Sequence, residues 1–218
     1  MLLTPGHSAA LVDGQGHQYV SGNEGTNSSE ARASIIRHGV RDGYMFWTSD
    51  ATAAYRLVIP DVEVITRTMI TLTRVPAVIV IDKLIKKTTP STLQARFYAF
   101  NTDGKGSATA AEEGFAITRP SAMLRGLAIA GSGVAVHSAL PDIPAERAKT
   151  YPFIEASTVR PQKESFLVSV LEAVRGTGRG SATVTAEGGV YTVKFTGAGG
   201  QVTVRIMDTG AVPEFEIR

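Results

Sequence analysis

Hydrophobic and polar residues alternate along this 218-residue chain in short runs, and helical spacing is rare. Residues 62–72 place apolar side chains at every second position for most of their length, and this alternation predicts a half-buried strand. Residues 75–81 are almost wholly apolar and stop at Asp82, which predicts a buried strand that pairs back on the first. Similar runs rich in Val, Ile, Thr and aromatic residues occupy 93–100, 115–118, 121–130, 133–137, 153–159, 165–174, 182–186, 190–195 and 202–206.

Turn-forming residues separate these runs. Residues 101–104, 187–189 and 197–200 are rich in Asn, Asp and Gly, which tolerate the backbone angles of tight turns. Helical patterns are weak: residues 29–37 fit a helix or a strand equally well, and 144–149 form a second candidate helix. Many short strands joined by turns predict an all-β fold, an antiparallel two-sheet β-sandwich.

The expected domain organisation is a single sandwich with an addition. We expect residues 1–175 to form the β-sandwich, because the glycine-rich stretch that follows them interrupts the strand pattern. Residues 176–218 then form terminal β-hairpins packed on the same sandwich, as an edge addition too small to be a domain by itself. Residues 21–29 and 139–151 are predicted to be irregular.

The amino-acid composition limits the classes of partner that we expect. The chain is 43% hydrophobic and 19% charged with a net charge of +2, so no general basic field predicts nucleic-acid binding. No run approaches the roughly 18 apolar residues of a membrane span, and Met1–Pro5 lack the pattern of a signal peptide. The absence of cysteine excludes disulfides and thiol catalysis.

Histidine and aspartate near the start of the chain are candidate metal ligands. His7, Asp13 and His17 offer two imidazoles and a carboxylate, which suit zinc. His17 lies beyond the turn at Asp13, so the three converge only if a hairpin brings them together. The alternative is that the histidines lie on the surface and the aspartate serves the turn.

Other motifs predict no site. His38 and His137 lie near strand ends and are expected to be exposed or structural. The glycines at 14–16 and 176–180 open no helix after a parallel strand, so a nucleotide site is not expected. Ser8 lacks the glycine-flanked turn of a nucleophile elbow.

A basic, aromatic strand surface is a further hypothesis. Cations pair with acid groups and aromatic rings stack on sugar faces, so such a surface would suit a sulfated or carboxylated sugar. A solvated strand face that aids solubility is the alternative. The residues in question are Arg67, Arg74, Lys83, Lys86, Lys87 and Arg96, with Tyr44, Trp47 and Tyr55.

Three segments carry a resemblance to a known family. Residues 7–17 run from a histidine through apolar residues to Val-Asp-Gly, and residues 43–55 end in Asp-Ala-Thr-Ala-Ala-Tyr. Residues 67–84 join an Arg-led strand to a second strand through a proline turn. In this order the segments resemble the heparinase II/III-like polysaccharide lyases, whose first motif reads His-Asn-Thr before the apolar residues.

The resemblance implies both a fold and a reaction. It implies a supersandwich-like C-terminal β-sandwich, preceded in those lyases by a helical toroid, with an acidic polysaccharide bound between the two. The lyases act by β-elimination: a base removes the C5 proton of a uronic acid and a tyrosine or histidine protonates the leaving oxygen. They are mostly periplasmic or secreted, which sets the expected location although this chain shows no signal peptide.

The same resemblance makes His7 a zinc ligand and leaves the active centre incomplete. Ser8 stands where the family has asparagine, and the toroid, the first sandwich strands and the other zinc ligands have no counterpart. We therefore expect a fragment of a lyase that is inactive alone. A carbohydrate-binding or partner-docking sandwich is the alternative, and so is a metal site that His17 and Asp13 rebuild with His7. A truncated sandwich exposes sheet edges, which makes a homo-oligomer a further expectation.

Overall fold

The computed structural model describes residues 6–17, 30–111, 114–142, 151–175, 180–197 and 200–218. These residues form three antiparallel sheets and one short helix, α1 (Thr52–Arg56). The predicted all-β antiparallel sandwich is therefore confirmed. The helix in the described part is too short and too polar to cross a membrane. The predictions for residues 21–29, 144–149 and 176–179 concern residues outside the described part.

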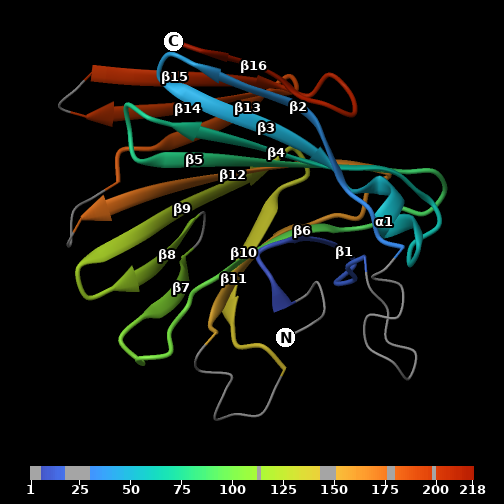
Figure 1. Cartoon of the computed structure of the whole chain (residues 1–218), viewed down its shortest axis with the longest axis horizontal. Coiled ribbons are helices and arrows are strands. Elements are labelled where there is room, and N and C mark those ends of the chain that lie inside the picture. The colour runs from blue at the N-terminus through green and yellow to red at the C-terminus, as the bar shows by residue number, and fades with distance from the viewer. Residues whose placement is uncertain (1–5, 18–29, 112–113, 143–150, 176–179, 198–199) are drawn as a thin grey trace.

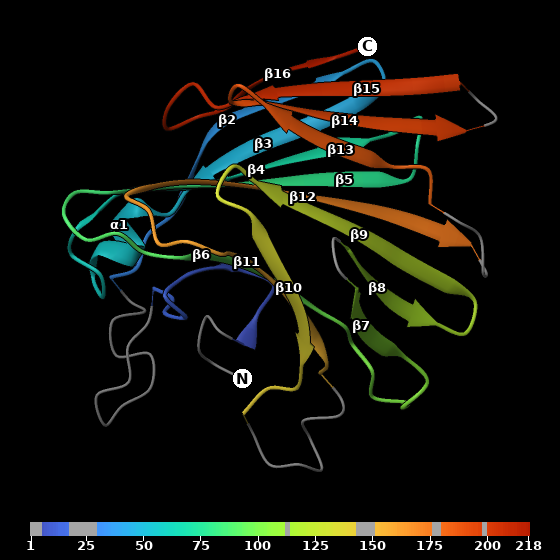
Figure 2. The ribbon, with the colours of Figure 1, turned by 180° about the vertical axis from the view of Figure 1, so that it is seen from behind.

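The three sheets are stacked in layers, with the largest in the middle (Figures 1 and 2). The middle sheet has the order β2 (Ser34–Arg41), β3 (Tyr44–Asp50), β4 (Val62–Leu72), β5 (Ala77–Lys86), β12 (Glu164–Arg175), β9 (Ala122–Ala130), β8 (Gly114–Arg119), β7 (Ser107–Ala111). One outer sheet has the order β1 (Ala10–Val12), β6 (Leu93–Tyr98), β11 (Phe153–Thr158), β10 (Val134–Ala139). The other contains β13 (Thr183–Glu187), β14 (Val190–Gly197), β15 (Gly200–Met207) and β16 (Glu214–Ile217).

Two apolar cores separate the layers. Leu84 and Val80 of β5 face the first core, which the sheet containing β1 closes. Ile79 and Ile81 of the same strand face the second core, which the C-terminal sheet closes. Because successive side chains of a strand point to opposite faces, a strand covered on both sides must be apolar at consecutive positions. This explains the unbroken apolar run that predicted β5.

The strand β5 is longer than the sequence predicts. The apolar run that predicted it ends at Ile81, yet the strand continues to Lys86, and Asp82 and Lys83 are fully buried. Each charge has an opposite partner: Asp82 accepts from Arg67, and Lys83 contacts Glu164 and Asp208. A buried charge that is paired no longer requires a strand to end.

The second half of the segment at residues 29–37 forms a strand. Its residues from Ser34 onward belong to β2, which pairs with β3 through a two-residue turn at Asp42 and Gly43. Isoleucines at 35 and 36 favour the strand because β-branched side chains lose rotamer freedom in a helix. The helix alternative for this segment was therefore wrong.

The C-terminal strands cover a face of the sandwich. The apolar side chains of β14 and β15 pack against β4, β5 and β12 in the second core, and β13–β16 form a sheet of their own. Val193, Phe195, Val204 and Ile206 are fully buried there. These strands lie over the face of the middle sheet and not along its edge, where the sequence had placed them as an addition.

The strands β9, β8 and β7 curl around the end of the first core (Figure 1). The ring of Phe115 in β8 stacks on Phe97 of β6, with ring centroids 5.6 Å apart. Gly126 of β9 lies opposite Phe115, and a Cβ there would come within 2.0 Å of the phenyl ring. The glycine lets the ring lie flat across the strand and close the core.

Candidate functional site

The candidate site is built around β1, the short strand that follows His7. Its backbone pairs with β6, with Ala10 opposite Ala95, and the Arg96 amide donates to the Ala9 carbonyl at 3.0 Å. The Ser8 hydroxyl accepts a hydrogen bond from the Tyr98 amide at 3.0 Å. Residues 8–12 are therefore fixed to the outer sheet on one side.

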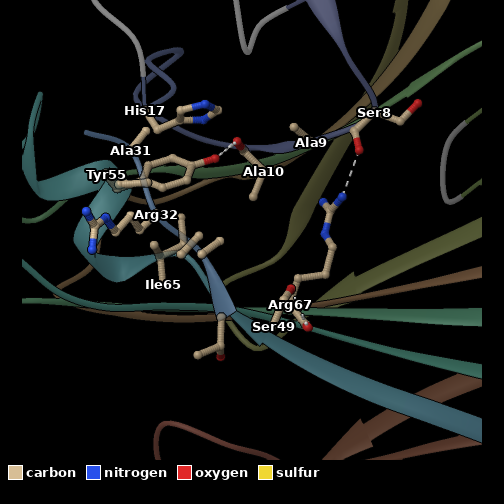
Figure 3. A pocket seen from close by; sticks show the side chains of 14 residues that line it. Ser8, Ala9, Ala10, His17, Ala31, Arg32, Ser49, Tyr55, Ile65 and Arg67 are labelled. Atoms are coloured by element: carbon tan, nitrogen blue, oxygen red, sulfur yellow. Dashed lines mark hydrogen bonds between the residues drawn. The ribbon is translucent and has the colours of Figure 1, made fainter. Parts of the chain in front are cut away.

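On the other side, the same segment borders a cavity of about 260 Å³ (Figure 3). Ser8 and Ala10 line it together with Tyr55 from α1, Arg67 from β4 and His17. The remaining lining side chains are mostly alanines, with Ile65, Ser49, Thr66 and Arg32. The cavity therefore brings His17, Tyr55 and the largely buried Arg67 into a common space.

Tyr55 uses its hydroxyl to hold β1. The phenol donates to the Ala10 carbonyl at 2.5 Å, and the side chain is almost fully buried. Burial raises the pKa of Tyr55 well above its ordinary value near 10; the Arg67 charge opposes this shift, and the Asp82 charge adds to it. The phenolic proton is thus retained and directed at the backbone.

Arg67 is a second support for β1. Its Nε and Nη2 atoms donate to the two Asp82 carboxylate oxygens at 2.7 and 2.9 Å, and Nη1 donates to the Ser8 carbonyl at 2.9 Å. Burial lowers the pKa of Arg67, but the adjacent Asp82 carboxylate outweighs this and raises it overall. The bidentate pair is therefore a fixed cation and anion that anchor the backbone of Ser8.

His17 completes the cavity wall. Its ring lies 5.8 Å from the Tyr55 ring, centroid to centroid, with the two planes inclined by 57°. Burial lowers the pKa of His17 below 6.5, and the charge of His7 lowers it further. The imidazole is therefore neutral at pH 7, and its ring packs against the ring of Tyr55.

The predicted group of His7, Asp13 and His17 does not assemble as a metal cluster. Asp13 lies in the turn after β1, where its carboxylate accepts hydrogen bonds from the Thr92 amide at 2.8 Å and hydroxyl at 2.9 Å. His7 is exposed just before β1. Among the described residues, no three His, Cys, Asp or Glu side chains gather closely enough to hold a metal ion. Asp13 has the role in a turn that the sequence offered as the alternative.

The prediction of a single basic, aromatic surface was wrong. Lys83 points into the second core and Arg67 toward the first, because their positions lie on opposite faces of the middle sheet. Tyr55 packs in the first core and Tyr44 against the second, so these rings share no surface. Five of the six cations are paired with carboxylates: Arg67 with Asp82, Arg74 with Asp42, Lys83 with Glu164 and Asp208, Lys86 with Asp61, Arg96 with Glu155.

The sequence did not predict a second polar group on the outer sheet. Glu155 of β11 accepts a 2.5 Å hydrogen bond from Arg96 Nε, and His137 Nε2 lies 3.6 Å from the same carboxylate. The Arg96 guanidinium also lies over the Phe153 ring, 4.6 Å from its centroid. Arg96, Glu155 and His137 lie directly opposite one another on adjacent strands, a relation that is visible only once the order β6-β11-β10 is known. His38, the remaining histidine, is exposed on β2, as expected.

Comparison with known proteins places the fold. No protein-family model and no curated protein match the sequence. Among solved structures, a mutant of heparan sulfate lyase HepC from Pedobacter heparinus superposes on 93% of the chain with a TM-score of 0.65 and 14% sequence identity. The heparinase III BT4657 gene product superposes on 93% with a TM-score of 0.61 and 6% identity. The chain shares its fold with part of these lyases.

The resemblance read from the sequence motifs is thus confirmed at the level of the fold. The chain spans only 30% of the length of either lyase. Within this lyase fold, the first motif becomes β1 and its turn, the second becomes β3 and α1, and the third becomes the hairpin of β4 and β5. Tyr55 and Arg67 come from the second and third motifs, and both donate to the backbone of the first.

Proposed function

We propose that this chain forms the C-terminal β-sandwich portion of a polysaccharide lyase that acts on uronic-acid-containing glycans by β-elimination. The observation that carries the proposal is the superposition of 93% of the chain on heparan sulfate lyases of which it covers only 30%. The part of such an enzyme without a counterpart here would be the helical toroid. The partners are then that toroid and an acidic polysaccharide, and the location is periplasmic or extracellular.

We further propose that the chain is inactive alone. β-Elimination needs a base for the C5 proton and an acid for the leaving oxygen, both placed against the sugar. In the cavity beside β1, the Tyr55 proton is committed to the Ala10 carbonyl, and the Arg67 charge is matched by Asp82. These groups support the strand and do not present themselves to a substrate.

We propose zinc binding only for His7, as a single ligand. A zinc site needs three or four nitrogen, sulfur or carboxylate ligands around one point. The described residues offer no such group, so by themselves they do not fit a zinc ion. In the proposal, His7 contributes one ligand and the others come from outside the described residues.

The zinc proposal predicts weak metal binding by the isolated chain. Protein purified without chelator and dialysed against metal-free buffer should retain well below one zinc per chain, and His7→Ala should leave this content unchanged. Metal analysis by mass spectrometry measures both. One zinc per chain, lost in His7→Ala and kept in His38→Ala, would show a complete site and contradict the proposal.

Electrophoresis through gels containing glycans tests the proposed role. Gels with heparan sulfate, alginate or neutral dextran distinguish a lyase portion from a dedicated binding module. We expect slight retardation in the two acidic gels and none in dextran, because the toroid would supply the other wall of the binding cleft. Strong retardation of the lone chain would favour a carbohydrate-binding module and contradict the proposal.

A further inference from the structure

The strand β2 is an open edge of the middle sheet. It is the first strand in the order of eight and, within the described residues, pairs only with β3. Figure 1 shows it at the border of the sheet, beside the C-terminal layer. Six of its eight residues are exposed.

Half of the exposed residues on this edge are apolar, whereas edge strands are usually protected by charge. Ile35, Ile36 and Val40 are exposed to 62%, 47% and 73%, and Met45 of β3, opposite Val40, is exposed to 40%. Arg37 gives the edge no protection, because its guanidinium folds over the Phe46 ring at 5.2 Å and donates to the Pro213 carbonyl. Exposed apolar edges of this kind are templates for strand pairing.

The hairpin register identifies which backbone groups face outward. Arg41 pairs with Tyr44 across a two-residue turn, so this pair and those at residues 39 and 37 direct their hydrogen bonds to β3. Residues 38 and 40 then direct their amides and carbonyls away from the sheet. Consistent with this, the Val40 carbonyl accepts a hydrogen bond from the side chain of Arg41, at 2.9 Å, and not from β3.

We propose that β2 pairs antiparallel with β2 of a second copy, about a twofold axis at His38, and joins two middle sheets into one. In this register His38 faces its own symmetry mate, and the bulge between Ile35 and Arg37 brings Ile36 beside Val40 of the other copy. The outward amide and carbonyl of His38 find partners, and the exposed isoleucine and valine cover each other. The contact is isologous, as twofold dimers require.

Charge selects this register over its neighbour. About an axis at Gly39, Arg37 would lie opposite Arg41 of the other copy, and like charges directly opposite are destabilising. About the axis at His38, Arg37 lies opposite Gly39 and Arg41 opposite Ile35. The strand is therefore complementary to itself, which favours a second copy over an unrelated partner.

Sedimentation analysis of the whole chain tests the dimer. We expect wild type to form a particle of two chains that dissociates on dilution. Val40→Lys should raise the dissociation constant at least about tenfold, since it places a charge in the apolar pair on both sides of the axis. Val159→Lys is the matched control, because Val159 is 56% exposed and lies outside this edge; it should leave the dissociation constant unchanged.

Cysteine cross-linking tests the register, since the chain has no cysteine of its own. In a hydrogen-bonded antiparallel pair the Cα atoms lie about 5.5 Å apart, within disulfide reach, so His38→Cys should oxidise to a covalent dimer. In Val40→Cys the two cysteines would lie about 13 Å apart along the strands and should not cross-link.

Each outcome of these two experiments either supports or overturns the proposed dimer. A concentration-dependent dimer, weakened by Val40→Lys and cross-linked at 38, supports the proposal. A monomer at every concentration, an equal effect of Val159→Lys, or a dimer that fails to cross-link at 38 would overturn it. A thermal unfolding curve of each variant confirms that the exposed substitutions leave the fold intact.

Discussion

At the scale of single residues, two side chains from distant segments fix the short segment that follows His7. Tyr55 donates to the Ala10 carbonyl and Arg67 donates to the Ser8 carbonyl, and both carbonyls belong to the same short segment. The Tyr55–Ala10 hydrogen bond is buried, and a buried carbonyl that loses its donor keeps its desolvation penalty, so the Tyr55 hydroxyl should contribute measurably to stability.

Tyr55→Phe tests this support. Removal of the hydroxyl should lower the free energy of unfolding by about 1–3 kcal/mol, because the Ala10 carbonyl is left buried without its partner. Urea unfolding followed by fluorescence or circular dichroism measures the change. Tyr44→Phe is the control and should stay within about 0.5 kcal/mol of wild type; equal losses in both variants would contradict the assigned role.

The raised pKa of Tyr55 predicts that the stability of the fold depends on pH. The raised pKa of Tyr55 means that the folded chain retains a proton that the unfolded chain releases near pH 10. Its contribution is complete below that pH and is lost as the pH rises, and the raised pKa values of Tyr98 and Tyr191 act in the same direction. Stability should therefore fall above about pH 10. The difference between wild type and Tyr55→Phe should shrink there; a constant difference would contradict this account.

Gly126 tests the packing at the curled end of the sheet. Gly126→Ala puts a methyl group where the Phe115 ring lies, so the ring must move, and we expect a loss of about 1–3 kcal/mol in unfolding free energy. Gly131→Ala is the matched control, because its nearest neighbour, the Tyr191 hydroxyl, would be 3.5 Å from the new Cβ. Chemical denaturation of both variants decides between them; equal effects would show that the ring contact is unimportant.

At the scale of elements, a buried lysine joins two layers. Lys83 of β5 contacts Glu164 of β12 and Asp208, which follows β15, and its ammonium lies over the Phe166 ring. The lysine therefore ties the C-terminal sheet to the middle sheet at one end of the second core. Its side chain is fully buried, so it depends on both carboxylates.

Asp208→Asn should weaken this junction. Loss of one carboxylate leaves the buried ammonium with a single, largely exposed partner, and we expect about 2 kcal/mol or more of destabilisation. Hydrogen exchange should rise in β14 and β15 before it rises in β4. The control Glu216→Gln removes an exposed carboxylate of the same sheet and should change stability by less than about 1 kcal/mol; uniform exchange across all sheets would contradict a local junction.

Most elements could be predicted from alternation, but not their layering. The bounds of β4 match the alternating run of residues 62–72, because buried and half-buried residues alternate along most of this strand. No residue of β2 is buried, and alternation is lost over Ser34–Ile36, because the strand is an edge with a bulge between Ile35 and Arg37. The helix α1 has only five residues, too few for a 3.6-residue period to appear.

The candidate site was predictable only in part. The motifs singled out the three segments that meet at the site, but the hydrogen bonds of Tyr55 and Arg67 join positions 45 and 59 residues apart. Asp82 gave no signal as a partner, because a charge at the end of an apolar run indicates a strand terminus as readily as an ion pair. Pairing of buried charges depends on strand order, which local sequence does not encode.

At the scale of the whole molecule, three layers form a body that matches less than a third of the heparan sulfate lyases. The two cores are closed by their own sheets, so the chain folds as a unit around residues such as Leu84 and Phe195. Tyr55 and Arg67, which face the cavity beside β1, are tied to the Ala10 carbonyl and to Asp82 respectively. The account therefore predicts a stable fold without elimination chemistry.

The most direct test is the release of unsaturated uronate from heparan sulfate by the purified chain, followed by the ultraviolet absorbance of the product. A heparan sulfate lyase serves as the positive control, and alginate and heparin are assayed in parallel. We predict no absorbance above the buffer control at any chain concentration. Product that accumulates in proportion to the chain and vanishes in Tyr55→Phe, with that variant folded, would show a complete active centre in this sandwich and contradict the account.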